Sequence, residues 1–361
     1  MKQGWEIKKL GDFIKEHSIR NKSGVEYPVY SVTNSQGFCK DYFSKEVASK
    51  EKRTYKIVPF GCFAYNPSRI NVGSVDWQHC EENVIVSPLY VVFSISKDVM
   101  QEFLLRYLKS NFAMSLIDNF ARGTVRANLK FDTLCSFPIA IPSREEQERI
   151  VAELDCLSGI IEKKREQLKE LDALAESIFY TMFGDPITNE KGWEVKKWED
   201  VFSTKTGKLN ANAMVENGKY PFFTCSKESY FIDEWAFDCE ALLLAGNNAT
   251  AQYDVKYYKG KFNAYQRTYV LTLKDDNNSY CYFKYALENK LSLLQEQSIG
   301  GMTKYLTMGI LSNISFLSPP LTLQQEFTDK IAIIEKQKQL IKESIAQTTE
   351  LFNSRMAYYF N

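Results

Sequence analysis

Polar and cationic side chains that can hydrogen-bond to nucleic-acid bases recur in short loops along this chain. Arg, Lys, Asn, Gln, Ser and Thr are the types that reach base edges and phosphates. In the first half they are Thr33, Asn34, Ser35, Gln36, Asn66, Ser68, Arg69, Asn71, Arg122, Thr124, Arg126 and Asn128. In the second half they are Lys227, Asn247, Asn248, Thr250, Gln252, Gln266, Arg267, Thr268, Thr303 and Lys304. Any one of them could instead form a turn or face solvent, but two such sets in matching order favour recognition of DNA.

Four arginines are the strongest individual candidates for reading a base. They are Arg69, Arg122, Arg126 and Arg267. A guanidinium can donate two parallel hydrogen bonds to guanine, and this is the commonest specific contact between a side chain and a base.

The sequence carries no recognisable set of catalytic residues. Its two histidines, His17 and His79, are far apart and give little support to metal binding or Ser/His catalysis. The YNPS stretch at 65–68 lacks the second proline and the following aromatic residue of an amino-methyltransferase loop. Glu194 and Lys196 could be fitted to a nuclease pattern, but they belong to a phrase that occurs twice. We therefore predict a binding protein with no catalytic residue and no metal site.

The cysteines and the apolar runs bear on the cellular compartment. Eight cysteines are scattered without a CxxC pair, which favours reduced thiols over a disulfide framework or a zinc ribbon. The first residues, MKQGWEIKKL, lack the apolar core of a secretory signal. No run of 18 apolar residues predicts a membrane span. We expect a cytoplasmic protein.

Charge is balanced over the whole chain but not along it. The 45 basic and 45 acidic residues cancel. Residues 1–142 nevertheless carry a net charge of +5 and residues 143–183 one of −4, whereas residues 192–321 and 322–361 are neutral. A basic globular part beside an acidic helix is compatible with a DNA-reading domain attached to a protein-binding segment.

A ten-residue phrase occurs twice in the chain. GWEIKKLGDF starts at Gly4 and GWEVKKWEDV starts at Gly192, with six identical positions. Other stretches parallel one another in the same order, among them YPVYSVTNSQGF with YPFFTCSKESYF and FPIAIPSREEQE with FLSPPLTLQQE. The offset between the copies varies, which indicates a duplication whose loops differ in length.

Each half ends in a segment that predicts a long helix. Ser143 and Glu146 form a capping box at the start of the first segment, and Thr322 and Gln325 form one at the start of the second. Gly184 is placed to end the first helix. About forty residues at a rise of 1.5 Å make each helix roughly 60 Å long.

Apolar residues in both segments recur at alternating spacings of four and three, which is the heptad pattern of a coiled coil. In the first segment they are Ile150, Leu154, Leu157, Ile161, Leu168, Leu171 and Ile178. In the second they are Phe327, Ile331, Ile334, Ile341, Ile345 and Phe352, and Lys164 interrupts the first series. Such a seam could face a globular core, but its length favours pairing of the two helices. The pattern does not fix their direction.

Strand-like runs dominate the rest of each half. Aromatic and β-branched stretches alternate with Gly, Asn and Pro, and helical stretches are predicted at 100–118 and 280–297. We predict an α/β (α+β) fold of two β-rich α/β globular domains joined by two long helices. The predicted boundaries are 1–142 for the first globular domain, 143–183 for the first long helix, 184–191 for a linker, 192–321 for the second globular domain and 322–361 for the second long helix.

Taken in order, these stretches resemble the specificity (S) subunit of type I restriction–modification systems. The resemblance is carried by GWE-x-KK-x-x-D at the start of each half, by YNPSRINVGS and VSPLYVVF, and by FPIAIPSREEQERIVAELD and PPLTLQQEF before the helices. It implies two target recognition domains that each read half of a bipartite DNA site, mostly through residues 27–130 and 220–306. It also implies a pseudo-twofold repeat and an antiparallel coiled coil that sets the gap between the half-sites.

The resemblance implies partners as well. They are double-stranded DNA, two modification subunits that bind AdoMet and methylate adenine, and restriction subunits that use ATP. The chain itself would do no chemistry, bind no cofactor and contact no membrane; AdoMet, Mg and ATP would belong to the partner subunits. Since the second globular domain is neutral, we expect only modest affinity for DNA without those partners.

Three alternatives stay open from the sequence. The chain could serve a modification-only system, whose S subunit has the same sequence features. It could be a nuclease or methyltransferase fused to a recognition domain, although no motif supports this. It could also be a scaffold whose globular domains bind protein or sugar.

Overall fold

The computed structural model describes residues 5–40, 52–121 and 128–361. The chain forms two compact units. The first unit consists of residues 1–165 and 343–361, and the second consists of residues 166–342. Each unit therefore combines one globular part with one end of each long helix.

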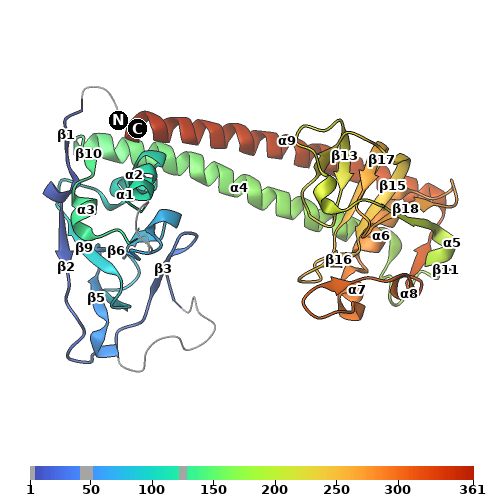
Figure 1. Cartoon of the computed structure of the whole chain (residues 1–361), viewed down its shortest axis with the longest axis horizontal. Coiled ribbons are helices and arrows are strands. Elements are labelled where there is room, and N and C mark those ends of the chain that lie inside the picture. Colours follow the sequence, from blue (N-terminus) through green and yellow to red (C-terminus); the bar gives the residue numbers. More distant parts are fainter. Residues whose placement is uncertain (1–4, 41–51, 122–127) are drawn as a thin grey trace. The chain divides into compact units, whose positions relative to one another are not determined.

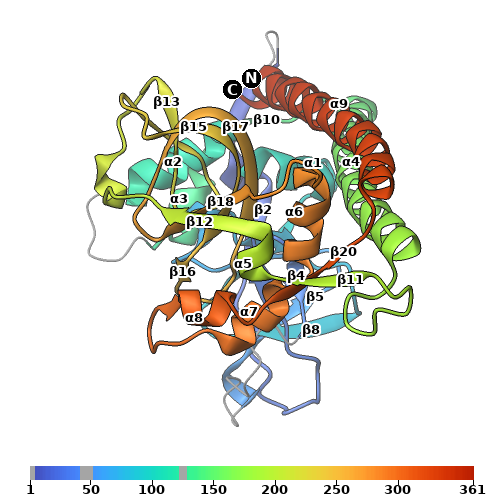
Figure 2. The same cartoon turned by 90° about the vertical axis from the view of Figure 1, so that its right-hand side faces the viewer.

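The two long helices are α4 (Arg144–Phe183) and α9 (Leu321–Phe360), each of 40 residues. They lie side by side in both ribbon views (Figures 1 and 2). In the first unit the Glu153 carboxylate pairs with the Arg355 guanidinium. In the second unit Asp172 of α4 pairs with Lys338 of α9 at 2.7 Å. Partner numbers fall in α9 as they rise in α4, so the predicted pairing is confirmed and its direction is antiparallel.

The predicted seam residues are all buried or half-buried. Ile150 and Leu154 lie in the core of the first globular part, and Phe327, Ile331 and Ile334 lie in the core of the second. The ends of the helices are thus core-facing helices as well as partners of each other.

Near its end, α4 departs from the predicted seam. Phe179 and Phe183 are almost completely buried, whereas Ile178 is half-buried. The rings of Phe183 and Phe327 lie 5.3 Å apart between centroids. The buried stripe shifts by one residue because this end of α4 faces a globular core as well as α9, so a strict 3.5-residue repeat no longer applies.

One of the two predicted capping boxes is wrong. Ser143 Oγ accepts a hydrogen bond from the backbone N–H of Glu146 at 3.4 Å, which is one of the two bonds of the predicted box, and the Glu146 carboxylate pairs with Arg149. Thr322, however, lies inside α9, which begins one residue earlier. The carbonyl of Pro320 accepts the first helical hydrogen bond, from the N–H of Leu323 at 3.0 Å. A proline just before the first turn has no N–H of its own to satisfy there, so the helix can start directly after it.

A buried glutamine near the start of each long helix hydrogen-bonds to backbone groups outside that helix. Gln147 Oε1 accepts the N–H of Met100 at 2.8 Å, and its amide donates to the carbonyls of Asp98 at 2.7 Å and Pro142 at 3.0 Å. Both Gln147 and its counterpart Gln324 have no exposed surface.

Gln324 makes the corresponding bonds in the second unit. Its Oε1 accepts the N–H of Ser279 at 2.8 Å, and its amide donates to the carbonyl of Pro319 at 2.8 Å. Ser279 caps helix α6 (Tyr280–Glu288), as Met100 precedes helix α1 (Gln101–Leu108). The same side chain thus ties each long helix to the first helix of its globular part.

The repeated phrase forms the second attachment of each globular part. Strand β1 (Ile7–Lys9) pairs antiparallel with β10 (Pro138–Ala140), directly before α4. Strand β11 (Glu194–Lys197) pairs antiparallel with β20 (Ser315–Ser318), directly before α9.

The tryptophans of the phrase reach the far ends of the helices. Trp193 Nε1 donates to the carbonyl of Phe183 at 2.8 Å, at the end of α4. Trp5 stacks on Tyr359 near the end of α9, with 6.5 Å between ring centroids. The duplicated phrase is therefore a structural element that closes each unit.

The first globular part contains a four-stranded antiparallel sheet in the order β2-β9-β6-β7 and two two-stranded pairs. The sheet strands are β2 (Ile14–His17), β9 (Val91–Ile95), β6 (Phe63–Tyr65) and β7 (Val75–Trp77). The pairs are β3 (Ser31–Thr33) with β4 (Gly37–Cys39) and β5 (Lys56–Pro59) with β8 (Asn83–Val86). The other helices are α1, α2 (Asn111–Ala121) and α3 (Phe131–Cys135), so the stretch predicted at 100–118 is two helices.

The second globular part has a larger, six-stranded sheet in the order β12-β18-β15-β17-β13-β14. These strands are β12 (Phe202–Thr206), β18 (Thr268–Leu273), β15 (Phe237–Ala245), β17 (Val255–Ala264), β13 (Tyr220–Phe223) and β14 (Tyr230–Ile232). A short pair joins β16 (Asn247–Asn248) to β19 (Lys304–Tyr305). The remaining helices are α5 (Trp198–Val201), α6, α7 (Leu291–Gln297) and α8 (Met308–Leu311). None of the helices in the described parts of the chain is long and apolar enough to cross a membrane.

We predict that Gln147→Ala and Gln324→Ala each lower the free energy of unfolding by about 1–3 kcal/mol, because each change leaves buried backbone groups without a partner. Denaturant unfolding followed by circular dichroism measures this. Gln167→Ala, an exposed position on α4, is the matched control. A loss at Gln147 no larger than at Gln167 would show that the buried amide does not anchor the helix.

Candidate nucleic-acid interface

In the first unit, the structure brings together three loops that the sequence separates. The hydroxyl of Ser68 donates to Asn128 Oδ1. The N–H of Leu129 donates to the carbonyl of Pro67 at 3.1 Å, and the carbonyl of Leu129 accepts from the Tyr65 hydroxyl at 3.1 Å. The loop at 65–74 and the segment that starts at Asn128 therefore form one surface.

The β3–β4 hairpin joins the same surface from the other side. Asn34 lies so close to Gly73 that a Cβ at Gly73 would be 2.4 Å from Asn34 Oδ1. Asp76 is buried and accepts the N–H of Phe38 at 3.0 Å. A Cβ at Gly37, whose φ is +60°, would meet Asp76 Oδ2 at 1.9 Å. The turn at 34–36 is thus held against the 65–74 loop by close contacts that need glycine.

The predicted first-half residues differ in how they are presented. Asn34, Ser35, Gln36, Ser68, Arg69 and Asn128 are exposed, and Asn66 and Asn71 are half-buried. Asn66 Oδ1 accepts the N–H of Ser68 at 3.0 Å, so it shapes the turn. Arg122, Thr124 and Arg126 lie outside the described residues.

Thr33 does not fit the prediction of a direct DNA contact. Its side chain is buried, and its Oγ1 accepts the N–H of Gln36 at 3.1 Å. A hydroxyl used in this way supports the hairpin from beneath.

In the second unit, four loops meet in a similar way. The pairing of β16 with β19 places Asn248 opposite Lys304. The N–H of Gly246 donates to the carbonyl of Arg267 at 2.8 Å, which fastens the 265–268 turn to the same place. The ammonium group of Lys256 donates to the carbonyl of Ser226, which brings in the turn that carries Lys227.

The predicted second-half residues again fall into groups. Lys227, Thr250, Gln252, Gln266 and Arg267 are exposed, and Asn247, Asn248, Thr303 and Lys304 are half-buried. Asn248 Oδ1 accepts the N–H and the hydroxyl of Thr250, both at 2.8 Å, and so shapes its own turn. Gln266 donates to Asn210 Oδ1 at 2.9 Å.

Thr268 is the second prediction that the structure corrects. It is 1% exposed, and its hydroxyl donates to the carbonyl of Phe223 at 3.3 Å. Thr268 therefore holds the turn that presents Arg267 and cannot itself reach a ligand.

Sequence reasoning missed the residues that hold the loops together. Asp76 carries a buried carboxylate that binds backbone N–H groups, and Gly73 and Gly246 allow close approach of neighbouring segments. Tyr305 lies beneath the Arg267 guanidinium, 5.6 Å from it to the ring centroid. A glycine next to polar loop residues was the available signal for Gly73 and Gly246; nothing local distinguishes Asp76 or Tyr305.

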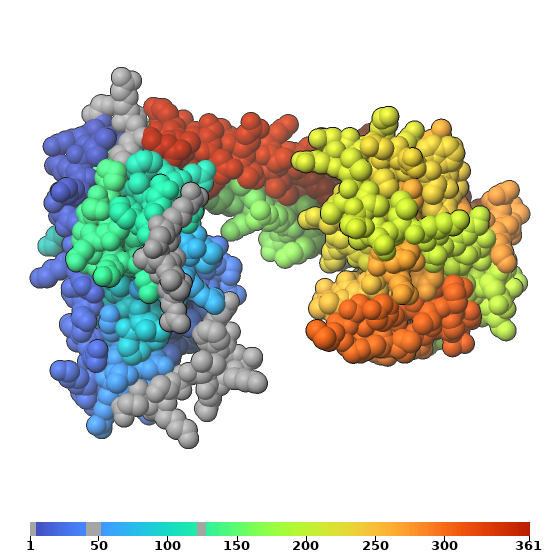
Figure 3. All heavy atoms as spheres, in the orientation of Figure 1, coloured from blue at the N-terminus to red at the C-terminus, as the bar shows by residue number. Residues whose placement is uncertain are grey.

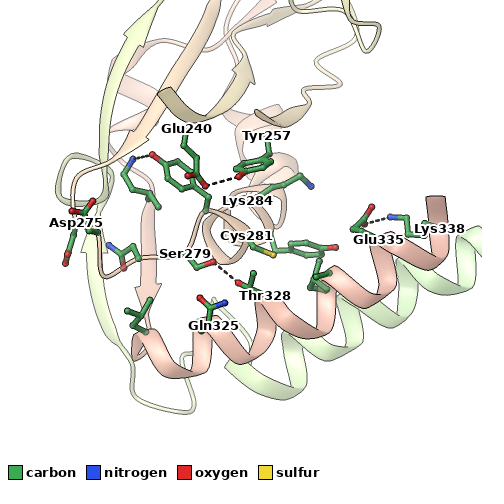
Figure 4. Close-up of a pocket in the computed structure, with 18 residues that line it drawn as sticks. Glu240, Tyr257, Asp275, Ser279, Cys281, Lys284, Gln325, Thr328, Glu335 and Lys338 are labelled. Atoms are coloured by element: carbon green, nitrogen blue, oxygen red, sulfur yellow. Dashed lines mark hydrogen bonds and ion pairs between the residues drawn. The ribbon is translucent and has the colours of Figure 1, made fainter. Parts of the chain in front are cut away.

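The second unit also contains a groove of about 820 Å³ between strands β15 and β17 of its sheet, α6 and α9 (Figure 4). Its charged groups are largely paired. Lys284 contacts Glu288 at 2.6 Å, and Lys338 contacts Asp172 and Glu335 at 2.7 Å each. Two further carboxylates, Asp275 and Asp276, line the groove without an ion pair in this unit.

The nucleophilic groups in this groove are not activated. The Ser279 and Thr328 hydroxyls bond to each other at 2.8 Å (Figure 4). Burial raises the pKa of the Cys281 thiol to about 11, so the reactive thiolate is scarce at neutral pH. The described residues also contain no group of three or more His, Cys, Asp or Glu side chains that could hold a metal ion.

Comparison with known protein families gives a match along most of the chain. A family model described as the type I restriction modification DNA specificity domain matches residues 2–172 and, a second time, residues 190–350. The two matches correspond to the two halves of the internal repeat.

Two curated proteins are similar over shorter stretches. The type I restriction enzyme EcoDI specificity subunit of Escherichia coli is 33% identical over 159 residues, which are 44% of this chain and 35% of that protein. The type I restriction enzyme MjaIX specificity subunit of Methanocaldococcus jannaschii is 27% identical over 288 residues, which are 68% of this chain and 66% of that protein. The matches thus span about a third and just under two thirds of these relatives.

Solved structures share the fold. The type I restriction–modification S subunit from M. genitalium has a TM-score of 0.60 at 13% identity, over 99% of this chain and 96% of that one. A chain from a structure of type I restriction–modification complex assembly has a TM-score of 0.60 at 16% identity, over 100% of this chain and 98% of that one. The predicted fold of two mixed α/β globular domains with two paired long helices is confirmed.

We predict that Cys281 reacts slowly with iodoacetamide at pH 8, because a thiol of pKa about 11 is then only about one part in a thousand thiolate. The exposed Cys156 serves as the reference. Mass spectrometry of the alkylated peptides gives both rates, and the rate at Cys281 should keep rising with pH up to about 11. Equal rates at pH 8 would reveal an activated thiol and reopen the groove as a catalytic site.

Proposed function

Because the chain belongs to the type I restriction modification DNA specificity family, we propose that it is the non-catalytic DNA-recognition subunit of a type I restriction–modification complex. Each unit reads one half of a bipartite double-stranded target. The observation that carries this proposal is the presence of one loop cluster in each unit, built from separate segments and exposing amide, hydroxyl and cationic side chains over a backbone tied down from below.

The construction of the clusters suits sequence reading. Base recognition needs side chains whose positions are set before DNA arrives, because each ordered side chain otherwise costs free energy on binding. Close glycine contacts at Gly73 and Gly246, and buried hydroxyls at Thr33 and Thr268, supply that order. The exposed amides and cations above them are the groups that pair with base edges and phosphates.

The paired helices are proposed to set the gap between the half-sites. Their seam contains apolar residues along its length and a polar contact in its middle, where Lys164 donates to Ser344 and to Thr348, the latter at 3.4 Å. A polar group in a helix seam favours one register over its neighbours. A helix pair with a single register has a single length, and a spacer requires a fixed length.

The same helices are proposed to dock two modification subunits, which would bring AdoMet, with Mg and ATP belonging to further restriction subunits. Ile333, Leu340 and Leu351 on α9 are 50–62% exposed. Ile160 and Leu174 on α4 are also exposed. Figure 3 shows part of the surface of α9, in red. Exposed apolar side chains on a helix support burial against a protein partner.

The first test is DNA binding by the complex with its modification subunits. Methylated positions in host DNA reveal the target, and fluorescence anisotropy then compares it with duplexes in which one half-site is scrambled. Scrambling either half should weaken binding, and affinity should fall steeply between 50 and 200 mM salt as counterions are released. Binding that is indifferent to either half-site, or flat with salt, would contradict the proposal.

The second test shortens the helices. Deleting residues 161–167 of α4 and 342–348 of α9 removes seven residues from each, or about 10 Å of helix at 1.5 Å per residue. The preferred gap should shrink by roughly three base pairs at 3.4 Å each while both half-site sequences stay the same. An unchanged gap, or changed half-sites, would refute the spacer. Circular dichroism confirms that the shortened chain is folded.

A further inference from the structure

We propose that Arg267 reads a guanine in the half-site of the second unit and that Tyr305 holds its guanidinium in the reading position. This inference rests on the proposed function, because it names the base that one residue of the second cluster recognises. It concerns a single base pair, so it can fail while the proposed function stands.

Arg267 is the only arginine among residues 166–342. The remaining cations of the second unit are lysines, which grip phosphates well but lack the planar fork that matches two acceptors at once. Guanine presents two acceptors, O6 and N7, on its major-groove edge, and a bidentate arginine is the side chain that suits them. In this unit Arg267 is the one side chain with a planar guanidinium fork for that contact.

The backbone of Arg267 is fixed from two directions. Its carbonyl accepts the N–H of Gly246 at 2.8 Å and lies 3.4 Å from Cys225 Sγ. A Cβ at Gly246 would stand 2.3 Å from that carbonyl oxygen, so only glycine permits the contact.

The next residue completes the anchor. The N–H of Thr268 donates to the carbonyl of Tyr265 at 2.8 Å, which closes the turn. Its buried hydroxyl donates to the carbonyl of Phe223. An exposed side chain on so constrained a turn points in a defined direction.

One face of the Arg267 guanidinium contacts an aromatic ring, and the N–H groups at its edge have no partner in the second unit. The guanidinium lies 5.6 Å from the centroid of the Tyr305 ring, in cation–π contact. In the second unit, all of whose residues are described, its N–H groups have no hydrogen bond or ion pair. Arginines of the first unit show the contrast, because Arg106 and Arg355 are paired with Asp155 and Glu153. Stacking restricts the plane of the guanidinium and leaves its donors available for a base.

The residues around Arg267 include further groups that can bind DNA. Tyr305 follows Lys304 on β19, and Asn248 lies opposite Lys304 on β16. A lysine and an amide beside the arginine can bind phosphate or a neighbouring base. Among residues 166–342, no acidic side chain forms an ion pair with Arg267 that DNA would have to displace.

The test uses the full complex with its modification subunits and selection from a DNA library, comparing the unchanged chain with Arg267→Lys and Arg267→Ala. The unchanged chain should require a G·C pair at one fixed position of one half-site. Both variants should lose preference at that position by about 10- to 100-fold, because each good bidentate pair carries discrimination of that order. The other half-site should be unchanged and serves as the internal control.

Arg267→Lys distinguishes base recognition from phosphate binding, because lysine keeps the positive charge but lacks the planar guanidinium group. Retention of the G·C preference by this variant would overturn the inference. The absence of a required G·C pair from both half-sites would also overturn it. Tyr305→Phe should retain the G·C preference because the aromatic ring remains, whereas Tyr305→Ala should weaken it. An equal G·C preference of these two variants would refute the role of the ring. Failure of the unchanged chain to select any sequence would count against the proposed function itself.

Discussion

The buried amides of Gln147 and Gln324 are the contacts on which the arrangement of each unit depends. Each satisfies backbone groups at the point where a globular part meets a long helix, in a place that water does not reach. Without these partners, buried N–H and C=O groups at this junction would be unpaired, which destabilises the folded unit. With them, a globular part cannot rotate about its helix without breaking several hydrogen bonds at once. Any function that needs a loop cluster at a set orientation to the helices relies on this joint.

The repeated and the divergent parts of the chain have different physical roles. The repeated phrase forms β1 and β11 and brings Trp5 and Trp193 to the helix ends. The sheets between these joints differ, with four strands in the largest sheet of the first unit and six in that of the second. The two loop clusters therefore rest on different scaffolds. The joints of the two units are thus repeated, whereas the loop surfaces that the units carry are not.

The charges of this chain matter through their local surroundings, since the net charge is zero. The exposed Lys227 and Arg267 of the second loop cluster form no ion pair within their unit. Along the helices the opposite holds, since Arg355 pairs with Glu153 and Lys338 with Asp172. Paired ions in a helix seam add specificity of register more than stability, whereas unpaired cations in a loop remain available to phosphates. The second unit can thus take part in DNA binding although its sequence is neutral.

The sequence by itself determined the periodic and repeated features. The heptad spacing of residues such as Ile150 and Phe327 predicted two paired helices, and the duplicated phrase predicted two related halves, because both patterns are local and need no knowledge of distant contacts. The polar loop residues could also be identified from the sequence, because the loops begin where the strand-like runs end. Burial could not be read in this way: Thr33 and Thr268 look like their exposed neighbours, and only the folded chain turns them inward. The direction of the helix pair, the shift of the buried stripe to Phe179 and Phe183, and the meeting of Tyr305 with Arg267 were likewise decided by the tertiary structure. Each depends on segments far apart in sequence coming together, and no local pattern encodes which surface will cover which residue.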